Sequence, residues 1–386
     1  MTQNTSIGII GSGAMGAGIA QVAAMAGHKV VLYDNNTTAL DKAKKSLAAT
    51  LQKLQDKGKI ASADEVQQRF SFADKTGSFA DCGLIIEAII EKLEVKKAVF
   101  SDIEKVVSAD CILASNTSSL SITSIAAACN KPERVMGLHF FNPAPVMALV
   151  EIIPAIQTAP GLIPGAKELM LQWGKTPVIA KDTPGFIVNR VARPFYGEAI
   201  RILEEGIADI PTIDWAMTEI GGFRMGPFTL MDYIGHDVNY VVTETVFQSF
   251  FYDPRYKPSF SQKRLLEAGW LGRKSGKGFY NYAEGTAMPD PTKDLVLGTR
   301  IFERILAMLI NEAVDALYLG VASVNDLETA MTKGVNYPKG LLQWCNEWGV
   351  DKCLEKLDSL YHEYHEDRYR ASTLLRKQAV GNKKFV

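Results

Sequence analysis

Short apolar runs alternate with stretches of helical periodicity over roughly the first 180 residues of the chain. The runs that predict strands occupy residues 7–10, 30–33, 84–90, 112–115, 135–140 and 150–153. Most of them are apolar throughout, as expected of strands that are covered on both faces. Strands that alternate with helices favour a parallel sheet with crossover helices. The pattern therefore predicts an α/β fold in this part, with a doubly wound, Rossmann-type sheet.

The pattern changes at residues 181–185, where Pro184 and Gly185 both oppose continuation of a regular element. Downstream, apolar residues recur at helical spacing from Val188 to Ile202, and few further runs have the character of strands. We place a domain boundary after residue 182. The second part of the chain is predicted to be mainly helical.

The helical part contains an ungapped internal repeat. Arg190 matches Arg304 at an offset of 114 residues, and the same offset aligns further glutamate, glycine and aspartate positions. Asn189, however, is matched by Glu303. We predict two tandem all-α copies of one domain, at residues 183–283 and 284–386, after a first domain at residues 1–182.

A glycine-rich turn follows the first predicted strand and opens a helix. Its glycines are Gly11, Gly13 and Gly16, the spacing of a dinucleotide-binding fingerprint. They allow a tight turn, a close approach of the backbone to a pyrophosphate, and close packing of helix on strand. Asp34 ends the second strand, where a carboxylate binds ribose hydroxyls and repels a 2'-phosphate. The cofactor predicted is NAD rather than NADP.

Composition narrows the classes of partner. The net charge of -1 gives no overall basic field, so we expect no nucleic acid and no anionic membrane surface as partner. No apolar run approaches the roughly 20 residues that span a bilayer. The five cysteines form no C-x-x-C pair, and the N-terminal residues lack the pattern of a signal peptide. We expect a cytoplasmic protein with reduced cysteines that binds a small molecule.

Removal of a hydride from a carbinol carbon requires a base near the hydroxyl, and histidine suits this task at neutral pH. A carboxylate on the far ring nitrogen fixes the tautomer and stabilises the imidazolium. His139 and Glu151 lie on two successive predicted strands, twelve residues apart. A lone histidine on an apolar strand is, however, more often structural than catalytic.

Several long motifs resemble those of the 3-hydroxyacyl-CoA dehydrogenase family, and the resemblance covers nearly the whole chain. They lie at residues 115–120, 137–143, 182–190 and 272–280. The resemblance implies oxidation of (S)-3-hydroxyacyl-CoA to 3-oxoacyl-CoA, with His139 as the base and Glu151 as its orienting acid. It also implies that Ser118 and Asn189 hydrogen-bond the reacting oxygen or hold the histidine.

The resemblance assigns further residues around the site. Glu91 and Lys96 match a pair near the family's cofactor and substrate cleft, with a helix-start acid and a solvated lysine as the ordinary alternative. Asn142 is expected to shape the cofactor side. Lys45 matches a lysine that meets a coenzyme A phosphate, although lysines along a helix usually form only a solvated face. No metal site is predicted; the pair His362 and His365 is interpreted as surface histidines.

The repeat bears on assembly. In single-copy relatives the helical domain resembles a dimerisation unit, so two tandem copies are expected to form an internal pseudo-dimer and leave the chain monomeric. Because Glu303 replaces Asn189, only the first copy is expected to contribute to catalysis.

Two alternative functions remain open. One is a sugar-acid or free hydroxy-acid dehydrogenase of the same fold, and the other is a catalytically silent NAD-binding structural or sensory protein. Acyl chain length and pathway are not decided by the sequence.

Overall fold

The computed structural model describes residues 5–385, and the chain divides into two compact units between Thr183 and Pro184. The change of unit falls within the segment that contains Pro184 and Gly185. In the part of the chain that is described, no helix has the length and apolar character needed to cross a membrane.

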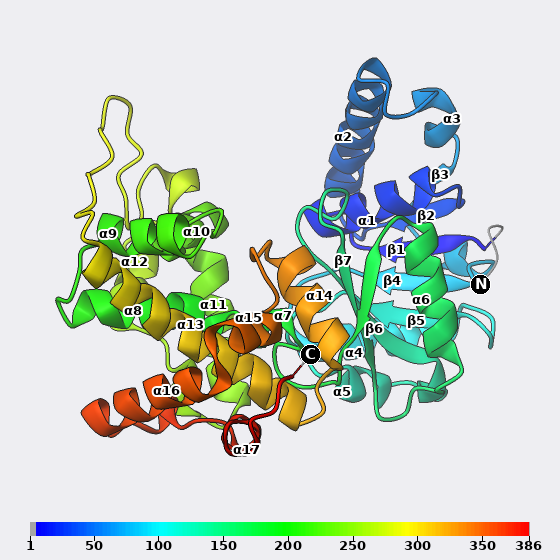
Figure 1. The fold of residues 1–386 in the computed structure, drawn as a ribbon. Coiled ribbons are helices and arrows are strands. Elements are labelled where there is room, and N and C mark those ends of the chain that lie inside the picture. The colour runs from blue at the N-terminus through cyan, green and yellow to red at the C-terminus, as the bar shows by residue number, and fades with distance from the viewer. Residues whose placement is uncertain (1–4, 386) are drawn as a thin grey trace. The chain divides into compact units, whose positions relative to one another are not determined.

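The first unit is built on one eight-stranded sheet (Figure 1). Its spatial order is β3-β2-β1-β4-β5-β6-β7-β8, so the chain moves outward from β1 in both directions. The strands are β1 Ile7–Ile10, β2 Val30–Tyr33, β3 Phe70–Ala73, β4 Leu84–Glu87, β5 Ile112–Ser115, β6 Val135–Phe140, β7 Leu149–Pro154 and β8 Thr176–Ile179. Every neighbouring pair is parallel except β6 and β7, which are antiparallel. The predicted α/β class is confirmed.

Helices cover both faces of this sheet. They are α1 Ala14–Met25, α2 Thr37–Asp56, α3 Ala63–Gln67, α4 Leu93–Glu104, α5 Ile122–Ala126 and α6 Leu162–Gln172. On one face, alternate strand residues such as Ile9 and Ile86 join a core with residues of α1, α2 and α6. On the other, Ile85 and Leu113 pack around Phe100 of α4. Coverage of both faces explains why the central strands are apolar at most positions.

Two strands lie at the sheet edges and were not predicted. β3 is only partly buried and mixes aromatic with polar positions. β8 contains Pro177, which cannot donate a ladder hydrogen bond and is tolerated at an edge. The antiparallel pairing of β6 with β7 also departs from the all-parallel prediction, because the eight residues 141–148 between them are too few for a crossover helix.

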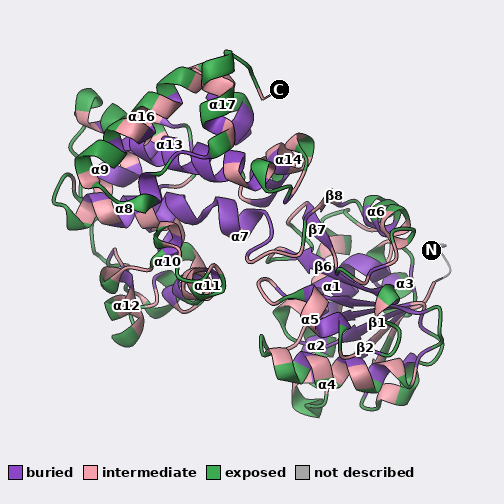
Figure 2. Ribbon diagram, turned by 90° about the horizontal axis from the view of Figure 1, so that it is seen from below, coloured by how far each residue is buried: buried purple, intermediate pink, exposed green. Residues whose placement is uncertain are grey.

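The second unit is helical, as predicted. Its helices are α7 Val188–Val191, α8 Arg193–Glu204, α9 Ile210–Trp215, α10 Pro227–Ile234, α11 His236–Ser249, α12 Phe260–Glu267, α13 Leu295–Tyr318, α14 Val324–Gly334, α15 Leu341–Trp348, α16 Val350–Tyr364 and α17 Thr373–Gly381. The longest, α13, is buried along most of its length and packs against α8 (Figure 2).

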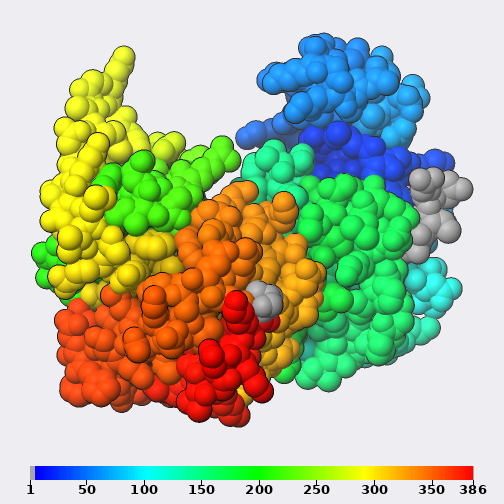
Figure 3. All heavy atoms as spheres, viewed as in Figure 1, coloured from blue at the N-terminus to red at the C-terminus, as the bar shows by residue number. Residues whose placement is uncertain are grey.

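The helix starts reproduce the offset of the sequence repeat. α9 and α14 begin at Ile210 and Val324, α10 and α15 at Pro227 and Leu341, and α11 and α16 at His236 and Val350. Each of these pairs is 114 residues apart. Between the two sets of helices runs a largely exposed segment, residues 283–294, which projects from the surface in yellow (Figure 3).

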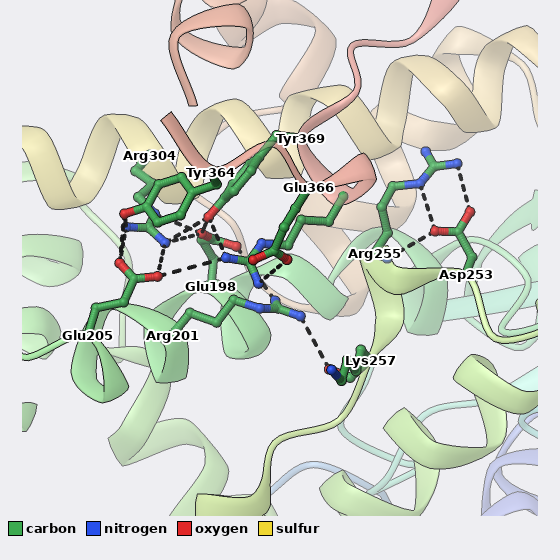
Figure 4. A network of polar contacts seen from close by, with 11 residues as sticks. Glu198, Arg201, Glu205, Asp253, Arg255, Lys257, Arg304, Tyr364, Glu366 and Tyr369 are labelled. Carbon is green, nitrogen blue, oxygen red and sulfur yellow. Dashed lines mark hydrogen bonds and ion pairs between the residues drawn. The ribbon is translucent and has the colours of Figure 1, made fainter. Parts of the chain in front are cut away.

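Buried ion pairs join the two sets of helices reciprocally. Nε of Arg190 donates to Oε1 of Glu312 at 2.6 Å, and Nε of Arg304 donates to Oε1 of Glu198 at 2.7 Å. Arg304 also binds Glu205, and the Tyr369 hydroxyl donates to Glu198 (Figure 4). An interface in which residue i meets j and the equivalent of j meets the equivalent of i has the pattern of a twofold dimer. The two sets of helices thus pair with each other through equivalent residues.

Candidate active site

The glycine-rich turn lies at the carboxyl end of β1, beside β4, where the chain reverses its direction across the sheet. Gly11 has φ +101°, a conformation that disfavours other residues. A Cβ on Gly16 would lie 1.8 Å from the Gly11 carbonyl oxygen, so this glycine is required for the helix to pack. A Cβ on Gly13 would meet no protein atom within 4 Å. Gly13 therefore leaves open space at the start of α1, where a bound pyrophosphate would meet helix N–H groups.

Asp34 follows β2 and is fixed by the same turn. Its Oδ2 accepts hydrogen bonds from both the backbone and the hydroxyl of Ser12, each at 2.7 Å, and Oδ1 accepts one from the backbone of Asn36 at 2.9 Å. Burial acts to raise the pKa of Asp34, but these hydrogen bonds outweigh it and hold the pKa below its usual value. The carboxylate is therefore charged at neutral pH and repels a phosphate at this position.

His139 and Glu151 are directly opposite one another in the antiparallel β6–β7 pair. Nδ1 of His139 lies 2.7 Å from Oε2 of Glu151, and the carboxylate is fully buried. A carboxylate at Nδ1 requires the proton to sit there in the neutral ring. Nε2 is then the nitrogen able to accept a proton from a hydroxyl. The predicted pair is brought together by strand register.

Glu91 joins the segment before α4 to the loop after β5. Its Oε1 accepts from the Thr117 hydroxyl at 2.5 Å and from the Ser118 backbone at 2.9 Å, and its Oε2 lies 3.2 Å from Nζ of Lys96. Burial acts to raise the pKa of Glu91, but the Lys96 charge and these hydrogen bonds lower it. Glu91 and Lys96 thus hold the loop that carries Ser118.

Lys96 is 1% exposed, so the alternative that it is only a solvated lysine is wrong. Its Nζ also donates to Oε1 of the fully buried Glu87 at 2.6 Å, and the Ser115 hydroxyl donates to Oε2 of Glu87 at 2.7 Å. Glu87 was not among the predicted residues. An acid that interrupts the apolar run 84–90 was the available signal.

Two other residues missed in the sequence fix the loops around His139. Oδ1 of Asn116 accepts from the backbone of Phe140 at 2.8 Å, which ties the loop after β5 to β6. Buried Lys175 donates to the carbonyl oxygens of Ala144 and Met147. These contacts hold the β6–β7 connection, which contains the exposed Asn142.

The remaining predicted residues lie on helices or directly after one. Lys45 is exposed on α2. Asn189 lies on α7, in the second unit. His362 and His365 are exposed, and no group of three His, Cys, Asp or Glu side chains within residues 5–385 is arranged to hold a metal ion. All five cysteines are free and buried.

These features are typical of an NAD-dependent dehydrogenase. They are the glycine turn at the switch point of the sheet, the acid after the second strand, and the buried His–Glu pair. A family model described as the 3-hydroxyacyl-CoA dehydrogenase NAD binding domain matches residues 6–183. The model of the C-terminal domain of the same family matches twice, at residues 185–282 and 301–384. The chain belongs to the 3-hydroxyacyl-CoA dehydrogenase family and is an NAD-dependent oxidoreductase.

Named relatives and a solved structure resemble this chain over most of its length. The chain is 38% identical to the 3-hydroxyadipyl-CoA dehydrogenase of Escherichia coli over 97% of both chains. It is 42% identical to a probable 3-hydroxybutyryl-CoA dehydrogenase of Deinococcus radiodurans, over 71% of this chain and 99% of that one. The crystal structure of 3-hydroxybutyryl-CoA dehydrogenase from Escherichia coli matches 98% of each chain, with a TM-score of 0.92 and 38% identity.

Proposed function

We propose that this chain oxidises the 3-hydroxyl of (S)-3-hydroxyacyl-CoA thioesters to the 3-oxo group, reversibly, with His139 as the base. The observation that supports this best is the 2.7 Å contact between Nδ1 of His139 and the fully buried Glu151. A desolvated carboxylate placed on one ring nitrogen orients the ring and stabilises its protonated form, which is what a general base needs.

The chain's own residues transfer a proton and stabilise the charges that form as it moves. Nε2 of His139 accepts the proton of the 3-hydroxyl as the carbonyl forms, and Glu151 stabilises the resulting imidazolium. Ser118 and Asn189 hydrogen-bond the reacting oxygen. NAD supplies the hydride acceptor when bound, in a site that includes Gly11, Gly13, Gly16 and Asp34.

The remaining assignments belong to the same proposal. Glu91 and Lys96 act at the cofactor side by fixing the Ser118 loop, a role supported by the 2.9 Å bond from the Ser118 backbone to Glu91. Asn142 lies on the same side. Lys45, exposed on α2, meets a phosphate of coenzyme A.

Assembly is proposed from the reciprocal ion pairs of the helical unit. Residues 183–283 and 284–386 act as two copies of one domain, and pairing of the copies replaces the contact between separate chains. We infer a monomer that works in the cytoplasm. The relatives are named for different acyl groups, adipyl and butyryl, so acyl specificity depends on this chain's own residues.

The test is NADH oxidation by the purified chain with acetoacetyl-CoA, free acetoacetate and a 3-oxo sugar acid, each over the same concentration range. Turnover confined to the thioester supports the proposal. Turnover with free acids alone would move the chain to the alternative dehydrogenase class. NADH binding without turnover of any substrate would favour the silent, structural alternative.

A further inference from the structure

Arg193, at the start of α8, is a buried cation without an acidic partner. Its side chain is 6% exposed, and no carboxylate among residues 5–385 forms an ion pair with it. Nη1 donates to the Thr243 hydroxyl at 3.1 Å, the guanidinium lies 4.9 Å from the centre of the Tyr196 ring, and Nε has no hydrogen-bond partner. A buried charge is normally paired because desolvation is costly.

The side chains around Arg193 supply more donors. The buried hydroxyl of Tyr337 has no hydrogen-bond partner and interacts electrostatically with both Arg193 and Tyr196. Burial raises the pKa of both tyrosines, which keeps their hydroxyls protonated. Burial also lowers the pKa of Arg193, yet a guanidinium stays charged in proteins. The cluster offers a positive charge and hydroxyl donors, and it lacks an anion.

The internal repeat shows that packing does not require these polar groups. At the offset of 114 residues, every polar member of the cluster corresponds to an apolar residue. The pairs are Arg193 and Ala307, Tyr196 and Ile310, Thr243 and Leu357, and Tyr337 and Phe223. Arg190 and Glu198, which join the copies, have the same residue types in the other copy, Arg304 and Glu312. Structural ion pairs are therefore retained twice, whereas the donor cluster exists once.

Arg193, Tyr196 and Thr243 belong to the copy that carries Asn189, the residue proposed to bind the reacting oxygen, and Tyr337 comes from the other copy. Asn189 and Arg193 are four residues apart in continuous right-handed helical backbone, because Ala192 between α7 and α8 has φ -80° and ψ -8°. Positions four apart lie on one helix face, separated by about 6 Å along the axis. Asn189 likewise lacks an equivalent, since Glu303 stands in its place.

We propose that Arg193, with the hydroxyls of Tyr196 and Tyr337, binds a carboxylate at the far end of the acyl chain. The substrates of this chain are then 3-hydroxyacyl-CoA thioesters of short dicarboxylic acids. A carboxylate about three carbons beyond the hydroxyl carbon suits a spacing of about 6 Å between Asn189 and Arg193. This inference rests on the proposed function, because it takes Asn189 as the residue that meets the 3-hydroxyl.

The experiment compares kcat/KM for 3-hydroxyadipyl-CoA and 3-hydroxyhexanoyl-CoA, which have equal chain length and differ in a terminal carboxylate or methyl group. The wild type is expected to prefer the carboxylate by about tenfold or more, as for a charge-assisted hydrogen bond. Arg193→Met removes this preference, Arg193→Lys retains part of it, and Tyr337→Phe, which copies Phe223, reduces it. Arg201→Met, at a partly buried arginine of α8, leaves the ratio unchanged.

The outcomes separate the two proposals. If the wild type oxidises neither thioester, the proposed function fails. If it oxidises the methyl-terminated and the dicarboxylic substrate with equal kcat/KM, the carboxylate inference is overturned while the proposed function stands. Thermal unfolding provides a second readout: Arg193→Met should keep or raise Tm, since it removes an unpaired buried charge. A lower Tm with an unchanged selectivity ratio would assign Arg193 a purely structural role.

Discussion

Replacement of Glu151 by glutamine removes one charge from the His–Glu pair and keeps its shape. The carboxylate is 0% exposed and 2.7 Å from Nδ1 of His139, so solvent screens the pair weakly. At a charge separation of about 4 Å and an effective dielectric of about 20, the lost attraction for the imidazolium is about 4 kcal/mol. Since about 1.4 kcal/mol corresponds to a factor of ten, kcat should fall about 1,000-fold.

The assay is steady-state oxidation of (S)-3-hydroxybutyryl-CoA, with NADH binding measured separately by fluorescence. Binding of NADH should change little, because the glycine turn and Asp34 lie at the carboxyl ends of β1 and β2. The matched control is Glu104→Gln, which alters a carboxylate of the same unit that accepts from the backbones of Asn130 and Lys131. A loss of less than tenfold in Glu151→Gln, or an equal loss in the Glu104 variant, would refute the electrostatic role of Glu151.

Gly13→Ala should fold with unchanged Tm, because its Cβ meets no protein atom, and should weaken NADH binding about tenfold or more, because the Cβ enters the space for the pyrophosphate. Gly16→Ala should lower Tm, because its Cβ would lie 1.8 Å from the Gly11 carbonyl oxygen. Equal effects of the two variants on Tm would contradict this assignment. Burial acts to raise the pKa of Glu198, but the charges of Arg304 and Arg201 hold it below its usual value of 4.5. The ionised Glu198 therefore stabilises the folded state fully above pH 4.5, and this contribution is lost as the pH falls through the lowered pKa. The free energy of unfolding, measured in urea between pH 3 and 6, should therefore depend less on pH in Glu198→Gln than in the wild type, and equal slopes would argue against this coupling. Light scattering at micromolar concentration should give the mass of one chain, 42.3 kDa, whereas a stable dimer would contradict the internal pairing of the copies.

Much of the fold could be predicted from the sequence because local signals agree with the tertiary structure there. The central strands are apolar at most positions since helices cover both faces, and Gly11 in the glycine turn has a positive φ that favours glycine. The edge strands β3 and β8 were not predicted, because the partial exposure of β3 and Pro177 in β8 weaken the strand pattern. The antiparallel direction of β7 relative to β6 follows from the short connection between them, residues 141–148. The apolar pattern of the strands does not indicate this direction.

The site was predictable where one motif carried both partners. His139 and Glu151 came from the motif and from the chemistry of hydride transfer, and their exact opposition in the sheet supplied the geometry. Lys96 and Glu87 were not predictable as a pair, because a lysine on an amphipathic helix looks the same whether it faces solvent or a buried acid. Arg193 was missed for a related reason: only the structure shows that a buried arginine has no carboxylate beside it.

The role proposed for His139 is that of the base in oxidation of a 3-hydroxyacyl thioester. The most direct measurement is the single-turnover rate of NADH formation from (S)-3-hydroxybutyryl-CoA, with wild type and His139→Ala both saturated with NAD and substrate. We expect this rate to fall about 100- to 10,000-fold in the variant, with NADH affinity retained. A variant that forms NADH at a rate within a few-fold of wild type would contradict a role of His139 as the base.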